Sequence, residues 1–315
     1  MRKLSVLMFA SAILFMSVAS EAAELVRFAY PAKSLNYLPL ILGKHKGFYQ
    51  AEGIDPEFIM VGSMTSAKAL TTGDLEFSGA QAQVLGAAAK GLPVKVIAFI
   101  TVKPSFWLIA KPEIRSIADL KGKVLGTTAI GSSTDTLARY LLKKNGLVPD
   151  KEVTMFATGT TGNILAAMKG GTVDAGILSP PFNAFAKTLG FRILAYLGDH
   201  VEQSISGIGT SEKLLREKPE MVKKVLRASL KGLRFVRQNR DETVQYIARD
   251  WSVDRPLAEE LYLSMIPAFS ADGSMAEKGI RETLEREREK LGIKEEIPLA
   301  RVVDLRLLKQ VQKEF

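Results

Sequence analysis

The chain has 315 residues, of which 47% are hydrophobic and 24% charged, a balance that excludes a disordered or low-complexity protein. Its formal net charge is +9, but the basic residues are interspersed with acidic ones rather than gathered in a run, which argues against a nucleic-acid partner. With no cysteine and only two histidines, the chain has no disulfide and no thiolate metal site, and we expect neither a metal nor a cofactor. The length fits two domains.

The first 22 residues have the pattern of an export signal. Arg2 and Lys3 precede an apolar run over residues 4–19, and Ser20 and Ala22 are small residues of the kind that signal peptidase reads. The run is shorter than the ~20 residues that a membrane-spanning helix needs, so we expect cleavage after Ala22 rather than an anchor. The mature chain, with net charge +8 and no cysteine for lipid attachment, is then expected in the periplasm of a Gram-negative bacterium.

Strand and helix patterns alternate along the first part of the mature chain, which predicts mostly parallel sheets. We predict strands at 25–30, 56–61, 75–78, 94–101, 107–110, 123–127, 153–156 and 173–178, and helices at 39–50, 66–72, 82–90, 134–145 and 163–169. From Ser211 onward the pattern becomes nearly all helical, with amphipathic segments at 221–239, 241–251, 256–266 and 277–291. Trp107 is expected in the core of its strand.

Segments 69–78 and 167–176 follow one plan, in which a helix ends at glycine and the next strand has an acidic second residue. Two similar lobes would produce such an echo. Chance would produce it too, because glycine commonly ends helices in α/β chains.

Three predicted helices begin with hydroxyl side chains directly after a strand, within residues 62–66, 131–134 and 159–163. The first N–H groups of a helix lack partners inside the helix, and the helix dipole contributes ~0.3–2 kcal/mol toward a nearby anion. Such starts suit an anionic or strongly polar ligand. For any one of the three, an ordinary Ser or Thr N-cap explains the pattern equally well.

Motifs for familiar chemistry are missing from the sequence. Residues 126–133 have the glycine spacing of a phosphate-binding loop, but Ser132 stands where that loop requires lysine. No dinucleotide fingerprint, nucleophile elbow or H-E-x-x-H pair occurs. His45 and His200 are expected at solvated positions. The sequence therefore predicts a binding protein rather than an enzyme.

Six short motifs, in a fixed order behind the export signal, resemble a known family. They are FAY at 28–30, NYLPL at 36–40, GFYQAEGI at 47–54, IADLKGK at 117–123, GSS at 131–133 and GTVDA at 171–175. This set is similar to the substrate-binding proteins of ABC importers for alkanesulfonates, taurine, nitrate and thiamine pyrimidine precursors.

The resemblance implies an α/β, two-lobed periplasmic-binding-protein fold of type II. Lobe one would comprise residues 23–104 and 207–315, with the helical C-terminal part packed on it, and lobe two residues 105–206. The chain would cross between the lobes near 103–106 and 204–207. Ligand would bind in the cleft at the carboxyl ends of the strands, and the lobes would close about a hinge.

The same resemblance places ligand-binding candidates on both walls of the cleft. In lobe one they are Ser34, Leu35, Asn36, Tyr37, Ser63, Met64 and Gln81. In lobe two they are Ser132, Ser133, Thr134, Thr160, Thr161, Ser179, Pro180 and Phe182. For Tyr37 and Phe182, simple packing explains the residue type as well as stacking on a ligand.

Asp135 departs from the pattern of the alkanesulfonate binders. A carboxylate in the first turn of this helix would repel a nearby anion by roughly 1 kcal/mol at 4 Å in water. If Asp135 points into the cleft, an amine-bearing or neutral heterocyclic ligand is expected. If it faces solvent, it only complements the helix dipole.

We therefore predict a monomeric periplasmic receptor that captures a small polar or anionic organic molecule, such as a sulfonate, nitrate-like ion, aromatic acid or pyrimidine. It would deliver this ligand to an ABC permease and its ATPase in the inner membrane. Two alternatives stay open: a periplasmic sensor or adaptor, and an enzyme like the pyrimidine-precursor synthases. The synthases carry a cysteine-rich motif that this chain lacks. The sequence does not name the ligand.

Overall fold

The structure is a computed structural model that describes residues 23–31 and 33–315. The predicted export signal, residues 1–22, lies outside the described residues. Within the part of the chain that is described, no helix has both the length and the apolar character needed to cross a membrane.

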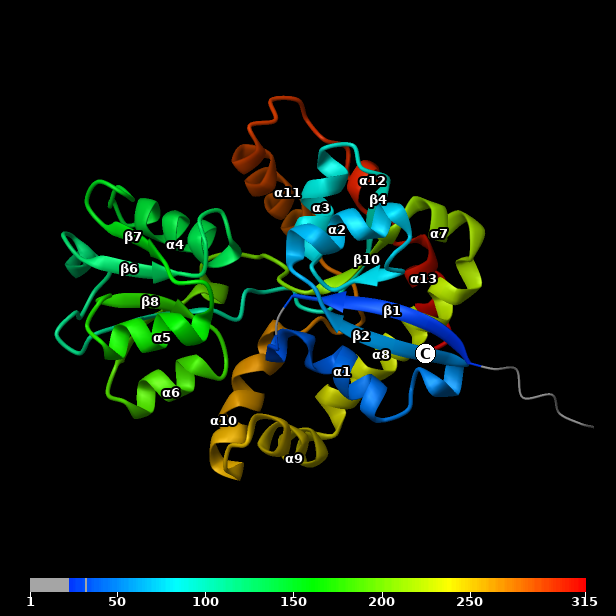
Figure 1. The fold of residues 1–315 in the computed structure, drawn as a ribbon, viewed down its shortest axis with the longest axis horizontal. Coiled ribbons are helices and arrows are strands. Elements are labelled where there is room, and N and C mark those ends of the chain that lie inside the picture. The colour runs from blue at the N-terminus through cyan, green and yellow to red at the C-terminus, as the bar shows by residue number, and fades with distance from the viewer. Residues whose placement is uncertain (1–22, 32) are drawn as a thin grey trace, which may run out of the picture.

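Two five-stranded sheets form the centres of two α/β lobes (Figure 1). The first sheet has the order β2-β1-β3-β10-β4 and the second β7-β6-β8-β5-β9. The strands are β1 (Glu24–Tyr30), β2 (Ile54–Met60), β3 (Phe77–Ser78), β4 (Val94–Phe99), β5 (Trp107–Ala110), β6 (Val124–Thr127), β7 (Thr154–Ala157), β8 (Ala175–Leu178), β9 (Arg192–Tyr196) and β10 (Gly207–Ser211). In each sheet one strand, β10 or β5, runs antiparallel to both neighbours. The predicted two-lobed α/β fold is confirmed, with sheets that are mixed rather than wholly parallel.

Helices cover both faces of each sheet, and alternate residues of a strand face opposite sides. The helices are α1 (Leu38–His45), α2 (Ser63–Thr72), α3 (Gln81–Ala89), α4 (Ser133–Lys144), α5 (Thr161–Lys169), α6 (Phe182–Thr188), α7 (Glu212–Glu217), α8 (Pro219–Gln238), α9 (Arg240–Trp251), α10 (Arg255–Met265), α11 (Glu277–Leu291), α12 (Leu299–Val302) and α13 (Arg306–Gln312). In β1, Phe28 packs in the core that includes α1 and α8, whereas Ala29 packs in the core that includes α3 and α11. In β5, Leu108 faces the core under α4, whereas Trp107 faces the core under α5. The Trp107 ring contacts that of Tyr196 in a tilted arrangement, with 4.8 Å between ring centroids.

The two sheets repeat one plan. If β1, β2, β3, β10 and β4 are matched with β6, β7, β8, β5 and β9, the strand orders become identical. The helix α2 and strand β3 then correspond to α5 and β8, which are the elements that carry the echo between segments 69–78 and 167–176. The sequence echo therefore falls on equivalent places in the two lobes.

No range was predicted for α6, β9 and β10, nor for the helices α7, α12 and α13, which fall in the part predicted to be nearly all helical. The strand β10 has the sequence GIGTS, whose two glycines obscure the apolar pattern of a strand. It nevertheless pairs with both β3 and β4, so the segment directly before the predicted helical region lies inside the first sheet.

The chain crosses between the lobes twice, at residues 100–106 and 197–206, and the two crossing segments are bonded to each other. Ile100 N and Thr101 N donate to Ser206 O at 2.9 and 3.0 Å. In return, Ile205 N and Ser206 N donate to Thr101 Oγ1, both at 2.9 Å. The predicted crossings at 103–106 and 204–207 overlap these segments.

Asn36 in lobe one bonds to both crossing segments. Its side-chain Oδ1 accepts from Ser105 Oγ at 2.5 Å, and its backbone oxygen accepts from Ser206 Oγ at 2.6 Å. All three residues are buried. Because buried polar groups are costly to leave unpaired, these bonds fix the crossing segments to the loop that follows β1.

Candidate ligand-binding site

A cavity of about 510 Å³, here called the cleft cavity, is enclosed by residues of both lobes and of both crossing segments. Lobe one contributes the loop after β1 and one side chain of α3, and lobe two contributes the starts of α4, α5 and α6. The lining residues are Pro31, Lys33, Ser34, Asn36, Tyr37, Gln83, Phe106, Thr128, Ser132, Ser133, Thr134, Gly159, Thr160, Thr161, Gly162, Ser179, Phe182 and Ile205. The cavity thus lies at the carboxyl ends of β1, β6, β7 and β8, where open α/β sheets bind ligands.

The structure brings most of the sequence-predicted site residues together around this cavity. Those that line it are Ser34, Asn36, Tyr37, Ser132, Ser133, Thr134, Thr160, Thr161, Ser179 and Phe182. Those placed elsewhere are Leu35, Gln81 and Pro180.

Local packing or backbone geometry explains why these predicted residues do not line the cavity. Leu35 is buried in the lobe-one core, and Pro180 forms a cis bond to Pro181 in the turn before α6. Gln81 is fully buried, with a side chain that lies against Gly207 of β10, where a Cβ on the glycine would come within 2.9 Å of the Gln81 Cγ. Ser63 and Met64 begin α2, which follows the edge strand β2.

Several lining residues were missed by the sequence analysis. Phe106 and Ile205 belong to the crossing segments, and Thr128, Gly159 and Gly162 flank predicted hydroxyl residues. Lys33 directly precedes the predicted Ser34. Its charge in a loop after a strand was the signal that could have identified it.

The start of α4 is built from three hydroxyls that bond to one another. Thr128 Oγ1, Ser132 Oγ and Thr134 Oγ1 lie at 2.9 Å from each other in all three pairs. Ser132 also caps the helix, because its Oγ accepts from Asp135 N at 3.3 Å. Ser132 therefore has a structural task, and among the described residues no partner is bonded to the Ser133 hydroxyl, which lines the cleft cavity next to it.

Asp135 faces neither the cleft nor solvent, so both alternatives derived from the sequence are wrong. It is 2% exposed and does not line the cleft cavity. Its carboxylate accepts from Arg139 Nε at 3.0 Å and from Gly131 N at 2.9 Å. Since Arg139 neutralises it, Asp135 offers little repulsion to an anion at the start of α4.

Two glycines in neighbouring strands set the position of α5. Gly126 of β6 lies opposite Gly176 of β8, and a Cβ on Gly176 would come within 2.2 Å of Ile164 of α5. Glycine in a strand interior marks such a close approach. With the helix seated there, Thr160 caps its start by accepting from Asn163 N at 3.1 Å, and Thr161 lines the cavity.

The lobe-one wall presents a neutral aromatic residue. Tyr37 is buried, and burial raises the pKa of its phenol, which therefore stays protonated at neutral pH. It contacts Tyr30, with ring centroids 6.0 Å apart. Ser34 caps the turn at Leu35–Tyr37 by accepting from Asn36 N at 3.3 Å.

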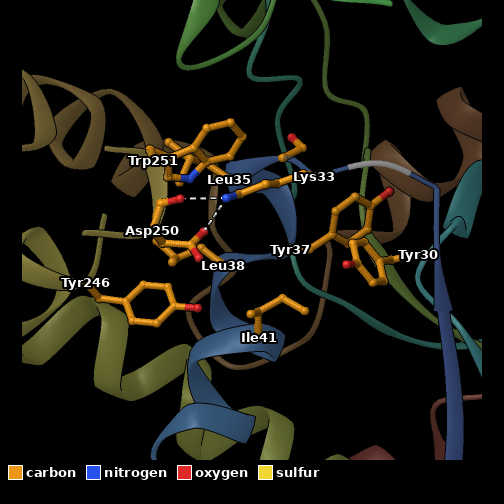
Figure 2. A pocket seen from close by; sticks show the side chains of 10 residues that line it. Tyr30, Lys33, Leu35, Tyr37, Leu38, Ile41, Tyr246, Asp250 and Trp251 are labelled. Atoms are coloured by element: carbon orange, nitrogen blue, oxygen red, sulfur yellow. Dashed lines mark hydrogen bonds and ion pairs between the residues drawn. The ribbon is translucent and has the colours of Figure 1, made fainter. Parts of the chain in front are cut away.

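Among the described residues that line the cleft cavity, Lys33 carries the only charge. Figure 2 shows its ammonium beside Asp250 and Trp251 of α9. Lys33 Nζ donates to the Asp250 backbone oxygen at 2.6 Å, lies 3.2 Å from the Asp250 carboxylate, and lies 4.9 Å from the centroid of the Trp251 ring.

A second cavity of about 240 Å³, here called the side cavity, adjoins these residues (Figure 2). It is lined by Tyr30, Lys33, Ser34, Leu35, Tyr37, Leu38, Ile41, Tyr246, Asp250 and Trp251. Lys33, Ser34 and Tyr37 line both cavities. In the described part of the chain, no cluster of three or more His, Asp or Glu side chains is arranged to hold a metal ion.

These features define a two-lobed α/β fold of the periplasmic-binding-protein type with a cavity between the lobes, and the comparisons agree. Residues 34–243 match the family model described as NMT1/THI5 like, so the chain belongs to this family, as the sequence motifs predicted. The riboflavin-binding protein RibY of Chloroflexus aurantiacus is 27% identical over 245 residues, which cover 72% of this chain and 68% of RibY.

Solved structures with the same fold include two named for their ligands. The alkanesulfonate-binding protein SsuA of Xanthomonas axonopodis pv. citri, bound to MOPS, superposes with a TM-score of 0.71 at 20% identity over 92% of this chain and 99% of that one. The periplasmic nitrate-binding protein NrtA of Synechocystis PCC 6803 superposes with a TM-score of 0.73 at 15% identity over 93% and 89%. The other curated relatives include the putative binding protein YtlA of Bacillus subtilis, which is 24% identical over 239 residues that cover 73% of this chain and 71% of YtlA.

Proposed function

We propose that this chain is the periplasmic solute-binding receptor of an ABC importer and that it captures a small organic anion in the cleft cavity. The observation that carries the proposal is the charge of the cavity lining. The starts of α4 and α5 present their hydroxyls to this cavity. Within residues 23–31 and 33–315, Lys33 is the one charged residue in its lining, and the carboxylate of Asp135 is bonded away from it. Helix N-termini and a cation together favour an anion.

The lobes would close on the ligand about the crossing segments, which lie between them and are bonded through Thr101 and Asn36. The loaded receptor would then engage the permease and its ATPase as a monomer, with no chemistry of its own. Names of relatives and fold neighbours, among them riboflavin-, sulfonate- and nitrate-binding proteins, support the class of receptor and leave the ligand open.

A ligand screen by thermal unfolding tests this function. We would compare butanesulfonate and benzoate with their neutral amides, butanesulfonamide and benzamide, on the mature chain. A ligand at 100 times its Kd adds about 2.7 kcal/mol to the unfolding free energy and raises Tm by several degrees. Binding of the anions in preference to the amides supports the proposal, whereas equal or amide-preferring binding, or no binding of either anion, contradicts it.

Thr161→Val tests the position of the site with little change in side-chain shape. The loss of a charge-assisted hydrogen bond weakens binding of the anion by about ten- to a hundredfold. Thr188→Val is the matched control, because Thr188 ends α6 and its hydroxyl donates to Phe185 O, outside the cavity. Equal affinities for the two variants would remove Thr161 from the site.

A further inference from the structure

We infer that Lys33 selects for anionic ligands in the cleft cavity, and that Asp250 and Trp251 hold its ammonium beside the cavity until a ligand anion recruits it. This inference rests on the proposed function and assigns the residue that recognises the ligand's charge. It concerns one salt bridge at the boundary between the two cavities.

The position of Lys33 supports a role in both cavities. It lies in the loop that follows β1, and with Ser34 and Tyr37 it belongs to the lining of both the cleft cavity and the side cavity. A lysine side chain is a point charge on a flexible stem of four carbons. A change of rotamer therefore moves the ammonium between partners on α9 and a ligand in the cleft without a change in the backbone.

The present partners of Lys33 bind it weakly enough to be replaced. Its side chain is 52% exposed and that of Asp250 is 38% exposed, and ion pairs with this exposure contribute little to stability. A ligand anion between the lobes would be better shielded from water, where the attraction between opposite charges is stronger. The competition between Asp250 and the ligand therefore favours the ligand once the cleft is occupied.

The alternative is that Lys33 only anchors the loop after β1 to the end of α9. The bond to the Asp250 backbone oxygen at the last turn of that helix is consistent with such an anchor, because cations are favoured at helix C-termini. The two roles differ in what Asp250 does. As an anchor, Asp250 supports the site, whereas as a competitor it opposes ligand binding.

Lys33→Gln tests the first half of the inference. With butanesulfonate and benzoate as probes in isothermal titration, we expect a ten- to hundredfold loss of affinity, and little change for the two amides. Lys46→Gln is the matched control: Lys46 pairs with Glu242 and lies 4.7 Å from the Phe235 ring centroid, yet lines neither cavity. The control removes the same charge, so an equal loss in both variants would point to long-range attraction and overturn the inference.

Asp250→Asn tests the second half. Freeing the ammonium should tighten binding of both anions two- to fivefold. Unchanged or weaker binding would overturn the competition and leave Lys33 as an anchor. If the anions bind the wild-type chain and Lys33→Gln has no effect on their affinity, this inference is wrong and the proposed function stands. If neither anion binds the wild-type chain, both the inference and the proposed function are wrong.

Fluorescence of Trp251 reports the movement directly. The sequence has two tryptophans, so Trp107→Phe leaves Trp251 as the single reporter, and circular dichroism checks that this variant folds. Saturation with benzoate should change Trp251 emission as the ammonium leaves the ring, and Lys33→Gln in the same background should remove most of that change. An equal change in emission with and without Lys33→Gln contradicts recruitment of the ammonium. If the Trp107→Phe variant fails to fold, the affinities of the Asp250→Asn variant decide whether the ammonium is recruited.

Discussion

The hydrogen bond between Asn36 and Ser105 joins the loop after β1 to the first crossing segment in a buried position. Ser105 is 0% exposed and Asn36 is 2% exposed, so Asn36→Ala leaves the Ser105 hydroxyl buried without its 2.5 Å acceptor. An unpaired buried hydroxyl costs about 1–3 kcal/mol. Ser105→Ala likewise leaves the Asn36 Oδ1 without its hydrogen-bond donor. The double variant removes both partners, so we expect it to lose about 1–2 kcal/mol less than the sum of the single losses.

A double-mutant cycle by urea unfolding measures this coupling, with fluorescence and far-UV circular dichroism checked for coincident transitions. Asn36→Ala with Ser206→Ala is the control cycle, because Ser206 Oγ bonds the Asn36 backbone oxygen, which the alanine variant retains. We expect that cycle to be additive within about 0.5 kcal/mol. A coupling energy below about 0.5 kcal/mol for Asn36 and Ser105, or equal coupling energies in both cycles, would show that the bond between their side chains does not stabilise the fold.

Three further predictions concern the two lobes. Burial alone would raise the pKa of the Asp174 carboxyl, but hydrogen bonds from Lys111 and from a backbone N–H lower this pKa below its ordinary 3.8. The ionised carboxylate therefore stabilises the folded state above that pH, and this stabilisation is lost as the pH falls through the pKa of the folded protein. Asp174→Asn should therefore flatten the fall in unfolding free energy from about pH 5 to about pH 2, and an unaltered profile would contradict this. Gly176→Ala should cost about 1–3 kcal/mol in urea unfolding, because its Cβ would lie 2.2 Å from a methyl carbon of α5; a neutral result would show that α5 shifts freely. Glu260→Lys replaces a 2.9 Å ion pair with Lys187 that joins α10 to α6 across the lobes, so small-angle scattering should show a larger radius of gyration, restored by adding Lys187→Glu. Equal radii of gyration for the wild type, Glu260→Lys and the double variant would show that this ion pair does not hold the lobes together.

The fold was predictable where apolar periodicity and glycine stops were strong. The helix at Glu277–Leu291 and the strand at Trp107–Ala110 begin and end at the predicted residues. The strand β10 was not predictable from its own residues, because its GIGTS sequence becomes a strand only through pairing with β3 and β4.

The site was predictable where a helix start carries its own signal. Ser132 and Thr160 are N-caps that can be identified from the sequence alone. The environment of Asp135 was not, because its neutralisation depends on the positions that Arg139 and Gly131 take in the folded helix start. Gln81 followed a strand as the motif required, yet packing against Gly207 buries it away from the cavity.

The central claim is that the ligand binds between the starts of α4 and α5 and the loop after β1, in the cleft cavity. A crystal structure of the mature chain grown with whichever of benzoate and butanesulfonate binds more tightly tests it most directly. We expect the anionic group within hydrogen-bond distance of Ser133 and Thr161, with Tyr37 on the opposite wall. Density in the side cavity beneath Trp251, or on the outer surface with the cleft cavity filled only by water, would contradict it.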